Sequence, residues 1–490
     1  MSIKKEGYRM SINDLVLKVN DVLTGSVLII ALVGIGLLFT FKLGFIQIRG
    51  FKDGWNRTFG GLFSKKGDAG KDGMSSFQAL ATAIAAQVGT GNIAGAATAI
   101  AVGGPGAIFW MWISAFLGMA TIYGEAVLAQ TYKTEVNGEV TGGPVYYIKA
   151  AFKGNFGKVL STLFAIFIVL ALGFMGNMVQ SNSIGAAFTE VFQVYGINIP
   201  PITIGLVLAV LAGFIFIGGT KRLAAVVEKV VPVMAGVYIV GSLILIGLHI
   251  NHVPTAFMMI IKGAFDPKAV MGAGAGITVR EAIRFGVARG LFSNEAGMGS
   301  APNAAAKADV SHPAKQGLVQ MLSVFIDTLL LCTATAMMCM SSGIDPTREM
   351  QGAPWVQASL QESLGAFGPV FITVAMVFFA FTTLLGNCFY CDNLLTYIHK
   401  KEPGKKFMRG FRLVSAFVVF LGAGMEMSLL WDLSDVLMGV MALINIPVIL
   451  ILSGTAFKAI RDYEDQLKRG VNPVFKSADI ELEQKTDFWN

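Results

Sequence analysis

Gln87-Val88-Gly89-Thr90-Gly91-Asn92-Ile93-Ala94-Gly95 interrupts an apolar segment in the first half of this chain with three glycines and three polar side chains. Gly290-Leu291-Phe292-Ser293-Asn294-Glu295-Ala296-Gly297 does the same about half a chain later. A matched pair of interrupted membrane helices is the arrangement by which folds built from inverted repeats form a solute site near the middle of the bilayer. The two stretches therefore predict two discontinuous membrane helices, one in each half of the chain.

The composition supports a membrane protein. Hydrophobic residues make up 54% of the chain, charged residues only 14%, and the mean hydropathy is +0.64. Soluble domains carry about 25% charged residues. The 490 residues have room for about a dozen spans of roughly 20 residues each. We expect about eleven helices, over residues 22–41, 79–102, 106–130, 158–190, 200–219, 230–250, 278–303, 315–341, 367–396, 411–426 and 432–455.

The expected spans divide into two repeats. Residues 76–250 and 276–455 each hold five spans, and residues 20–41 form one extra N-terminal helix. An odd number of spans in each repeat implies that the repeats have inverted topology. The fold class predicted here is an all-α polytopic membrane protein with a 5+5 inverted repeat. The charged tail, residues 456–490, is expected to be a short helix running into disorder.

Basic residues indicate the orientation in the membrane. They crowd the loops after the first, fifth and ninth spans, and this group comprises Lys42, Arg49, Lys52, Arg57, Lys65, Lys66, Lys71, Lys221, Arg222, Lys229, Lys400, Lys401, Lys405, Lys406, Arg409 and Arg412. Loops rich in Lys and Arg face the cytoplasm, which predicts an outer N-terminus and a cytoplasmic C-terminus in the cell membrane. The four basic residues Lys4, Lys5, Arg9 and Lys18 oppose this orientation. The net charge of +7 thus reflects orientation and not nucleic-acid binding.

The first interruption has the chemistry to bind a carboxylate and a cation. The amides of Thr90 and Gly91 begin the second half-helix, where the positive end of the helix dipole attracts a carboxylate. The carbonyl oxygens that end the first half-helix attract a cation. An alternative is that Gly91 and Gly95 only allow close helix packing, as small residues four apart do.

Further polar groups lie in apolar spans. Ser293 and Asn294 interrupt the second broken segment. An alternative is that residues 274–309 are partly a loop outside the membrane, which would place the charged half there but not Ser293 and Asn294. Asn177, Gln180 and Ser181 share one helical face in the fourth span. Thr382, Thr383 and Asn387 are clustered in the same way in the ninth span. Each group could simply link two helices, but four such clusters favour a lined site.

Other classes of protein fit less well. An enzyme needs a nucleophile, a base or a metal set, and the chain has scattered histidines at His249, His252, His312 and His399 without a catalytic motif. The spacing Cys388-x-x-Cys391 has no second pair, so we expect no metal site there. A channel would need a continuous polar stripe, which no span supplies.

Three motifs resemble a known family. They are Gly89-Thr90-Gly91-Asn92-Ile93-Ala94-Gly95, Gly103-Gly104-Pro105-Gly106-Ala107-Ile108-Phe109-Trp110-Met111-Trp112, and Gly290-Leu291-Phe292-Ser293-Asn294-Glu295-Ala296-Gly297-Met298-Gly299-Ser300-Ala301-Pro302-Asn303. They are similar to the alanine or glycine:cation symporter family, of the sodium:amino-acid type. The resemblance implies sodium- or proton-driven uptake of a small neutral amino acid through a LeuT-type fold of eleven helices. It implies no cofactor besides Na⁺ as the coupling ion, and leaves the oligomeric state open.

The resemblance also implies roles for single residues. It places the substrate carboxylate at Thr90 and Gly91 beside Asn92, and the amino group near Gln180, Phe292 and Ser293. It places Na⁺ among the carbonyls of Ala85 and Val88 and the hydroxyls of Thr382 and Thr383. No carboxylate is expected beside that cluster, which argues against coupling by protons alone. The carboxylates that remain candidates for proton coupling are Asp327 and Glu295.

One position departs from the family pattern. The ninth span reads Leu385-Gly386-Asn387-Cys388-Phe389-Tyr390, whereas many alanine- and glycine-selective members carry Trp after this Leu-Gly pair. An amide in place of an indole opens volume and adds a donor and an acceptor. Asn387 is therefore expected to line the substrate site and to admit a longer amide such as glutamine.

Overall fold

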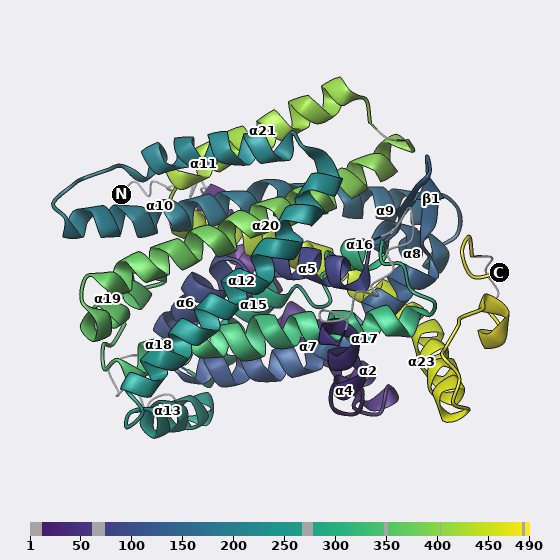
Figure 1. The fold of residues 1–490 in the computed structure, drawn as a ribbon, viewed down its shortest axis with the longest axis horizontal. Coiled ribbons are helices and arrows are strands. Elements are labelled where there is room, and N and C mark those ends of the chain that lie inside the picture. Colours follow the sequence, from purple (N-terminus) through teal and green to yellow (C-terminus); the bar gives the residue numbers. More distant parts are fainter. Residues whose placement is uncertain (1–11, 61–73, 267–277, 347–350, 402, 483–485) are drawn as a thin grey trace, which may run out of the picture.

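The computed structural model describes residues 12–60, 74–266, 278–346, 351–401, 403–482 and 486–490. Seven of its helices are long and apolar enough to cross a membrane. The long helices lie side by side (Figure 1), with α13 and α19 at one end of the bundle and β1, α8 and α23 at the opposite end. We call these the α19 end and the α23 end.

The first half of the chain begins with one nearly continuous helix. This helix consists of α1 (Ile12–Val22), the π-helical turn η1 (Leu23–Val27) and α2 (Leu28–Lys42), and is followed by the short helices α3 (Ile46–Arg49) and α4 (Phe51–Phe59). The next elements are α5 (Ser76–Gln87), η2 (Gly91–Gly95), α6 (Ala96–Gly103), α7 (Gly106–Thr131), α8 (Pro144–Ala151), α9 (Gly154–Ile168), η3 (Val169–Gly176), α10 (Asn177–Val194), α11 (Pro201–Phe216), α12 (Gly219–Leu248) and α13 (Val253–Phe265).

The second half repeats the pattern of a broken helix followed by long ones. Its elements are α15 (Val279–Asn294), α16 (Pro302–Ala305), α17 (Pro313–Val324), η4 (Phe325–Cys332), α18 (Thr333–Ser341), α19 (Ala353–Leu364), α20 (Phe367–His399), α21 (Lys405–Ala423) and α22 (Met427–Ile451). Helix α23 (Ser453–Lys468) and the 3-10 turn η5 (Ser477–Ile480) complete the chain. Both interruptions fall where the sequence predicts them, between α5 and η2 and between α15 and α16.

Four local features differ from the sequence prediction. Helix α12 begins at Gly219 instead of residue 230, and α21 begins at Lys405 instead of residue 411, because basic side chains at a span end can extend into the polar headgroup layer without ending the helix. Helix α13 was not expected. A hairpin of β1 (Thr134–Val136) and β2 (Glu139–Thr141) was also missed. Its turn is Asn137-Gly138, both with positive φ, which is a strong hairpin signal.

Helix α7 lies at the centre of one side of the bundle and packs most extensively against α15 and α17. Glycines make these contacts close. A Cβ added at Gly286 of α15 would lie 2.4 Å from the carbonyl oxygen of Ala107, and one at Gly317 of α17 would lie 2.8 Å from the ring of Tyr123. The second broken helix is therefore held against α7 at backbone distance.

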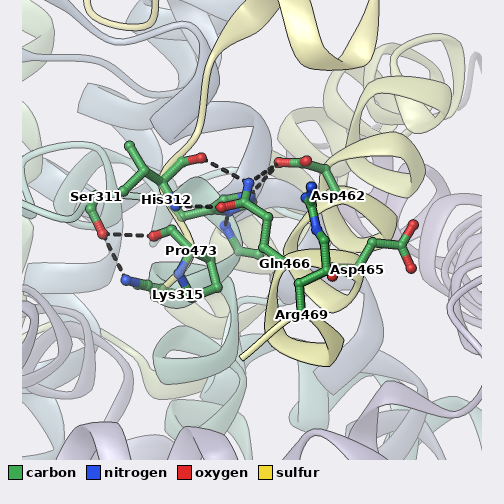
Figure 2. A network of polar contacts seen from close by, with 10 residues as sticks. Ser311, His312, Lys315, Asp462, Asp465, Gln466, Arg469 and Pro473 are labelled. Carbon is green, nitrogen blue, oxygen red and sulfur yellow. Dashed lines mark hydrogen bonds and ion pairs between the residues drawn. The ribbon is translucent and has the colours of Figure 1, made fainter. Parts of the chain in front are cut away.

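The tail folds back on the α23 end, contrary to the expected disorder. Figure 2 shows how α23 and the following segment meet the loop before α17. Nε2 of His312 lies 3.1 Å from Oδ2 of Asp462, and the amide of Phe475 donates to the carbonyl of Ser311 at 2.9 Å. Nζ of Lys315 donates to Oδ1 of Asn472 at 2.7 Å. Buried aromatic side chains, Tyr463, Phe475 and Trp489, supply the apolar surface that orders the tail.

The loop that binds the tail is also joined to the start of the first broken helix. Met74, just before α5, forms a parallel bridge with Ala308. Its amide donates to the carbonyl of Lys307 at 2.9 Å, and its carbonyl accepts from the amide of Asp309 at 2.8 Å. The start of α5 and the loop after α16 are thus fastened to each other at the α23 end.

Candidate functional site

The first break separates α5 from η2 and leaves backbone groups that side chains satisfy. Val88 and Gly89 lie outside regular helix. The amide of Thr90 donates to Oε1 of Gln180 at 2.9 Å, and the carbonyl oxygen of Val88 accepts from the hydroxyl of Thr383 at 3.1 Å. Irregular backbone at membrane depth is tolerated only where protein or a polar cavity satisfies it. The break therefore lies between α10 and α20, the two helices that carry the predicted polar faces.

Glycines at the break are required by the closeness of these partners. A Cβ at Gly89 would lie 2.5 Å from Oγ1 of Thr383 and 2.8 Å from Oε1 of Gln180. A Cβ at Gly91 would lie 3.0 Å from the ring of Phe292. The predicted residues of the first break, the fourth span, the second break and the ninth span are thus brought together.

The second break is linked directly to the first. Residues 295–301 lie between α15 and α16, and Glu295 has φ +59°, which ends α15. Nε2 of Gln87, the last residue of α5, donates to the carbonyl of Asn294 at 2.7 Å. This bond satisfies a carbonyl freed by the break. Gln87 was not among the predicted site residues, although its polar side chain ends an apolar helix.

Two buried carboxylates hold the second break in place. Oε2 of Glu125, on α7, accepts from the amide of Gly297 at 2.9 Å, and Nδ2 of Asn445 donates to the carbonyl of Gly297 at 3.0 Å. Glu295 accepts from the hydroxyl of Ser300 at 2.5 Å, so one of the two candidate proton carriers bonds within the break itself. Glu125 and Asn445 were missed by the sequence analysis. A carboxylate within an apolar span was the signal that could have identified Glu125.

The other candidate, Asp327, joins both breaks. It lies in the π-helical turn η4, and its carboxylate accepts from Nδ2 of Asn92 and from the hydroxyls of Ser293 and Thr328, each at 2.7 Å. Asn92 and Ser293 come from the first and second breaks. Among the described residues, no three His, Cys, Asp or Glu side chains gather as a metal-binding group. The cluster offers one carboxylate and several neutral oxygens, a set that suits a proton or a hard monovalent cation.

The predicted cation residues are only partly together. Val88 and Thr383 are in contact, and Ala85 is buried one turn earlier on α5. The hydroxyl of Thr382 instead donates to carbonyls of its own helix and lies 3.4 Å from Sδ of Met234 on α12. In this arrangement Thr383 faces the break and Thr382 faces α12.

Asn387 lies one turn beyond Thr383 on α20 and pairs across to the fourth span. Its Nδ2 donates to Oδ1 of Asn177 at 3.0 Å. Nδ2 of Asn177 in turn donates to the carbonyl of Gly173 at 2.9 Å, within the π-helical turn η3. The predicted polar faces of the fourth and ninth spans therefore do meet, through an amide pair.

An aromatic stack covers the break on the side of α22. The ring of Phe292 packs on Trp431 with centroids 4.4 Å apart, and the guanidinium of Arg289 lies 4.3 Å from the Trp431 ring. Arg289 also forms an ion pair with Asp435, with both side chains buried. Trp431 and Asp435 were not among the predicted site residues. An aspartate in the last apolar span was the available signal.

Several buried polar atoms around the site have no hydrogen-bond partner within the described part of the chain. They include Oγ1 of Thr90, Oδ1 of Asn387 and Nε1 of Trp431. A buried polar atom left unpaired costs about 1–3 kcal/mol. A small polar ligand would offset this cost by bonding to these atoms.

Comparisons with known proteins agree with this geometry. The profile described as "Sodium:alanine symporter family" matches residues 9–477. The chain is 42% identical over 460 residues to the amino-acid carrier protein AlsT of Bacillus subtilis, covering 94% of each protein. It is 39% identical to the sodium/alanine symporter AgcS of Methanococcus maripaludis, covering 93% of this chain and 99% of that one. It is 41% identical to the probable sodium/glutamine symporter GlnT of Bacillus subtilis, covering 93% and 91%.

A solved structure confirms the fold class. The protein MhsT, crystallised with L-phenylalanine, superposes with a TM-score of 0.51 at 13% identity, covering 86% of this chain and 95% of that one. The predicted LeuT-type fold with an inverted repeat is therefore confirmed. At this identity the similarity concerns the fold alone.

Proposed function

The chain belongs to the sodium:alanine symporter family, and we propose that it couples sodium entry to uptake of a small neutral amino acid by alternating access. It is a multi-pass membrane protein and a transporter, not an enzyme. The observation that carries the proposal is the junction at the first break, where the Thr90 amide meets Gln180 and the Val88 carbonyl meets Thr383. One side of the unwound turn offers a donor to an anion, and the other offers oxygens to a cation.

In the proposed substrate site, the carboxylate binds the amides of Thr90 and Gly91 beside Asn92. The Thr90 amide bonds to Gln180 at 2.9 Å, and a substrate carboxylate would displace this bond because a charged acceptor is stronger than a neutral one. Gln180 would then turn to the amino group, together with the backbone at Phe292 and Ser293. The positive end of the helix dipole also stabilises a carboxylate bound at a helix N-terminus.

In the proposed cation site, Na⁺ binds the carbonyl oxygens of Ala85 and Val88 and the hydroxyl of Thr383. Neutral oxygens are the ligands that hard cations prefer. The 3.1 Å contact between Thr383 and Val88 supports this placement. Thr382 would join the site only after its hydroxyl turns from Met234 toward the break.

The alternative is coupling by protons, and Asp327 is the observation that favours it. Its carboxylate is buried and receives three hydrogen bonds from neutral groups, with no ion pair to a described basic residue. One matched relative is named as a sodium/proton-dependent alanine carrier of Bacillus sp.. Asp327→Asn separates the two cases, because it should abolish uptake driven by a pH gradient and leave the sodium dependence of uptake in place.

We further propose that the α23 end faces the cytoplasm, with the N-terminus outside and residues 456–490 as a cytoplasmic tail. The support is the cluster of basic residues at the ends of α2, α20 and α21. The proposed units are the extra helix at residues 20–41 and two five-helix repeats at residues 76–250 and 276–455. The two repeats would rock against each other around the broken helices.

The function is tested by uptake into proteoliposomes. Alanine, glycine, serine and glutamine are supplied under an imposed sodium gradient, an imposed proton gradient, or neither. We expect accumulation of at least one of the four only when the sodium gradient is present. Equilibration of the amino acid across the membrane, with no accumulation under either gradient, would indicate a channel. Accumulation under a proton gradient alone would assign the coupling role to Asp327.

A further inference from the structure

The stretch that follows the second broken helix, residues 306–312, is held from two sides at the α23 end. On one side it pairs with the start of α5 through the bridge between Met74 and Ala308. On the other side Nε2 of Gln130, in the last turn of α7, donates to the carbonyl oxygens of Ala305 at 2.6 Å and of Ala308 at 2.8 Å. We call residues 306–312 the junction loop, because they join the first broken helix to α7.

The chain after α23 packs on this junction loop. We call its described residues, 471–482 and 486–490, the C-terminal strap. The amide of Phe475 donates to the carbonyl of Ser311 at 2.9 Å. The hydroxyl of Ser311 donates in turn to the carbonyl of Pro473 at 3.0 Å (Figure 2). The strap and the loop are thus paired in both directions.

The strap also binds the residues at the end of α7 that hold the junction loop. Nε1 of Trp489 donates to the carbonyl of Gln130 at 2.8 Å. Lys133, just after α7, is 5% exposed, and its Nζ donates to the carbonyl of Ala308 at 3.3 Å. The same Nζ lies 5.0 and 4.9 Å from the rings of Phe488 and Trp489, which attract a cation. One lysine therefore ties the strap to the residue that forms the bridge with α5.

The strap is closed on itself. The amide of Ser477 donates to the carbonyl of Trp489 at 2.6 Å. The rings of Phe475 and Trp489 pack edge to face with centroids 5.5 Å apart, and both are buried. Removal of either the Ser477 amide or the Trp489 ring should therefore open the strap and weaken its hold on the junction loop.

We propose that the C-terminal strap is a built-in restraint that keeps the α23 end closed. Among the described residues no hydrogen bond or ring contact joins the strap to α5 itself, so the strap acts through the junction loop, which it holds in the shape that pairs with Met74. Two contacts that require the same shape of one loop favour each other. Release of the strap should shift the population toward molecules in which α5 has parted from the loop. Under the proposed function, this shift also controls how often solute can leave toward the α23 side.

The test labels a thiol on α5 in the purified full chain, in detergent and without substrate. Ala83 is fully buried and lies one turn before Gln87, on the face of α5 that meets the second break. A thiol introduced by Ala83→Cys therefore reacts with a water-soluble maleimide only after α5 has moved away from its neighbours. Trp489→Ala and Ser477→Pro, each combined with Ala83→Cys, should raise the labelling rate at least fivefold. Ser477→Pro removes the amide that closes the strap.

Two matched variants and one native thiol are the controls. Ser477→Ala keeps the amide that Ser477→Pro removes. Trp110→Ala removes another indole that donates to a backbone carbonyl, that of Ala264 at 3.1 Å, at the opposite end of α7. Each should change the labelling rate less than twofold. Buried Cys339 on α18 reports a general loosening of the fold and should stay unlabelled in every variant.

The other outcomes overturn the proposal. An unchanged rate in Trp489→Ala or in Ser477→Pro would show that the junction loop keeps its shape without the strap. An equal rise in the control variants, or equal labelling of Cys339, would show that the effect is not specific to the strap. Should one strap variant fail to fold, the other decides alone. Labelling needs neither sodium nor transport, so a lack of sodium-driven uptake would contradict the proposed function and leave this result unaffected.

Discussion

Thr90, Gln180 and Thr383 form one polar junction although each comes from a different helix. Their residue types and their positions in apolar spans were sufficient to predict them as site residues. Their contacts were not predictable, because which of two adjacent threonines faces the break depends on the rotation of α20. Thr382 and Thr383 are neighbours in sequence but point to α12 and to α5 respectively.

At Thr383 we expect a loss of sodium affinity. Thr383→Ala removes the only threonine hydroxyl of α20 that reaches the first break among the described residues. The sodium concentration for half-maximal uptake should rise about tenfold, equivalent to about 1.4 kcal/mol. Uptake against sodium concentration is the measurement, with Thr373→Ala as a control that removes a buried hydroxyl elsewhere on α20. Unchanged sodium dependence would remove Thr383 from the cation site.

At Asn387 we expect a change in selectivity. Nδ2 of Asn387 is occupied by Asn177, whereas its Oδ1 is unpaired and could accept from a substrate amide. Asn387→Trp should exclude glutamine by steric clash and spare alanine and glycine. Asn387→Leu should weaken any glutamine uptake by about 1–3 kcal/mol. Uptake in competition among alanine, glycine, serine and glutamine measures the substrate preference of both variants. If both variants keep the wild-type order, selectivity must be sought around Phe292 and Asn294.

At the scale of elements, the spans and the two breaks were predictable because apolar runs and glycine clusters are local signals. The ends of α12 and α21 were not, because lysine and arginine were taken as loop residues although they extend both helices. The π-helical turns η3 and η4 were not predictable either. Each widens one turn of a long helix at the site, and η4 places Asp327 between Asn92 and Ser293. That placement depends on packing and has no sequence signature of its own.

The unwound turn of the first broken helix has its own prediction. Gly89→Ala would place a Cβ 2.5 Å from Oγ1 of Thr383 and 2.8 Å from Oε1 of Gln180. We expect at least a hundredfold loss of uptake with normal membrane insertion, because both partners must move. Gly236→Ala on α12 is the control, since its Cβ would meet nothing within 4 Å. Equal uptake by the two variants would contradict the close junction.

At the scale of the whole molecule, the tail was the largest error of the sequence prediction. Its high charge suggested disorder, but the aromatic residues that anchor it are spread thinly and have no periodic pattern. Trp489 is buried and donates to the carbonyl of Gln130, at the far end of α7. Contacts across such a sequence distance are set by tertiary structure.

The docked tail should make stability depend on pH. Burial lowers the pKa of His312 to about 4, and its hydrogen bond and charge interaction with Asp462 oppose this shift only partly, while Lys315 and Arg57 add to it. The folded pKa lies below the ordinary value of about 6.5, so the unfolded chain binds more protons between these pH values. Stability should therefore fall as pH falls from about 6.5 toward 4.

Thermal unfolding of the purified protein across this pH range measures the effect. His312→Asn should flatten the fall in Tm, because it removes the titrating group and keeps a polar cap before α17. The difference between the two pH profiles of Tm is the relevant quantity. Parallel profiles for the two proteins would refute a role of His312.

The bridge between Met74 and Ala308 affects the equilibrium between two conformations, one with this end fastened and one with it parted. Two backbone hydrogen bonds join the start of α5 to the loop after α16. At a net value of about 1 kcal/mol each, they favour the fastened form by roughly thirtyfold, so about 3% of unliganded molecules would have this end parted if nothing else differed. A bound solute or ion then needs only about 2 kcal/mol of preference for the parted form to make the two forms equal.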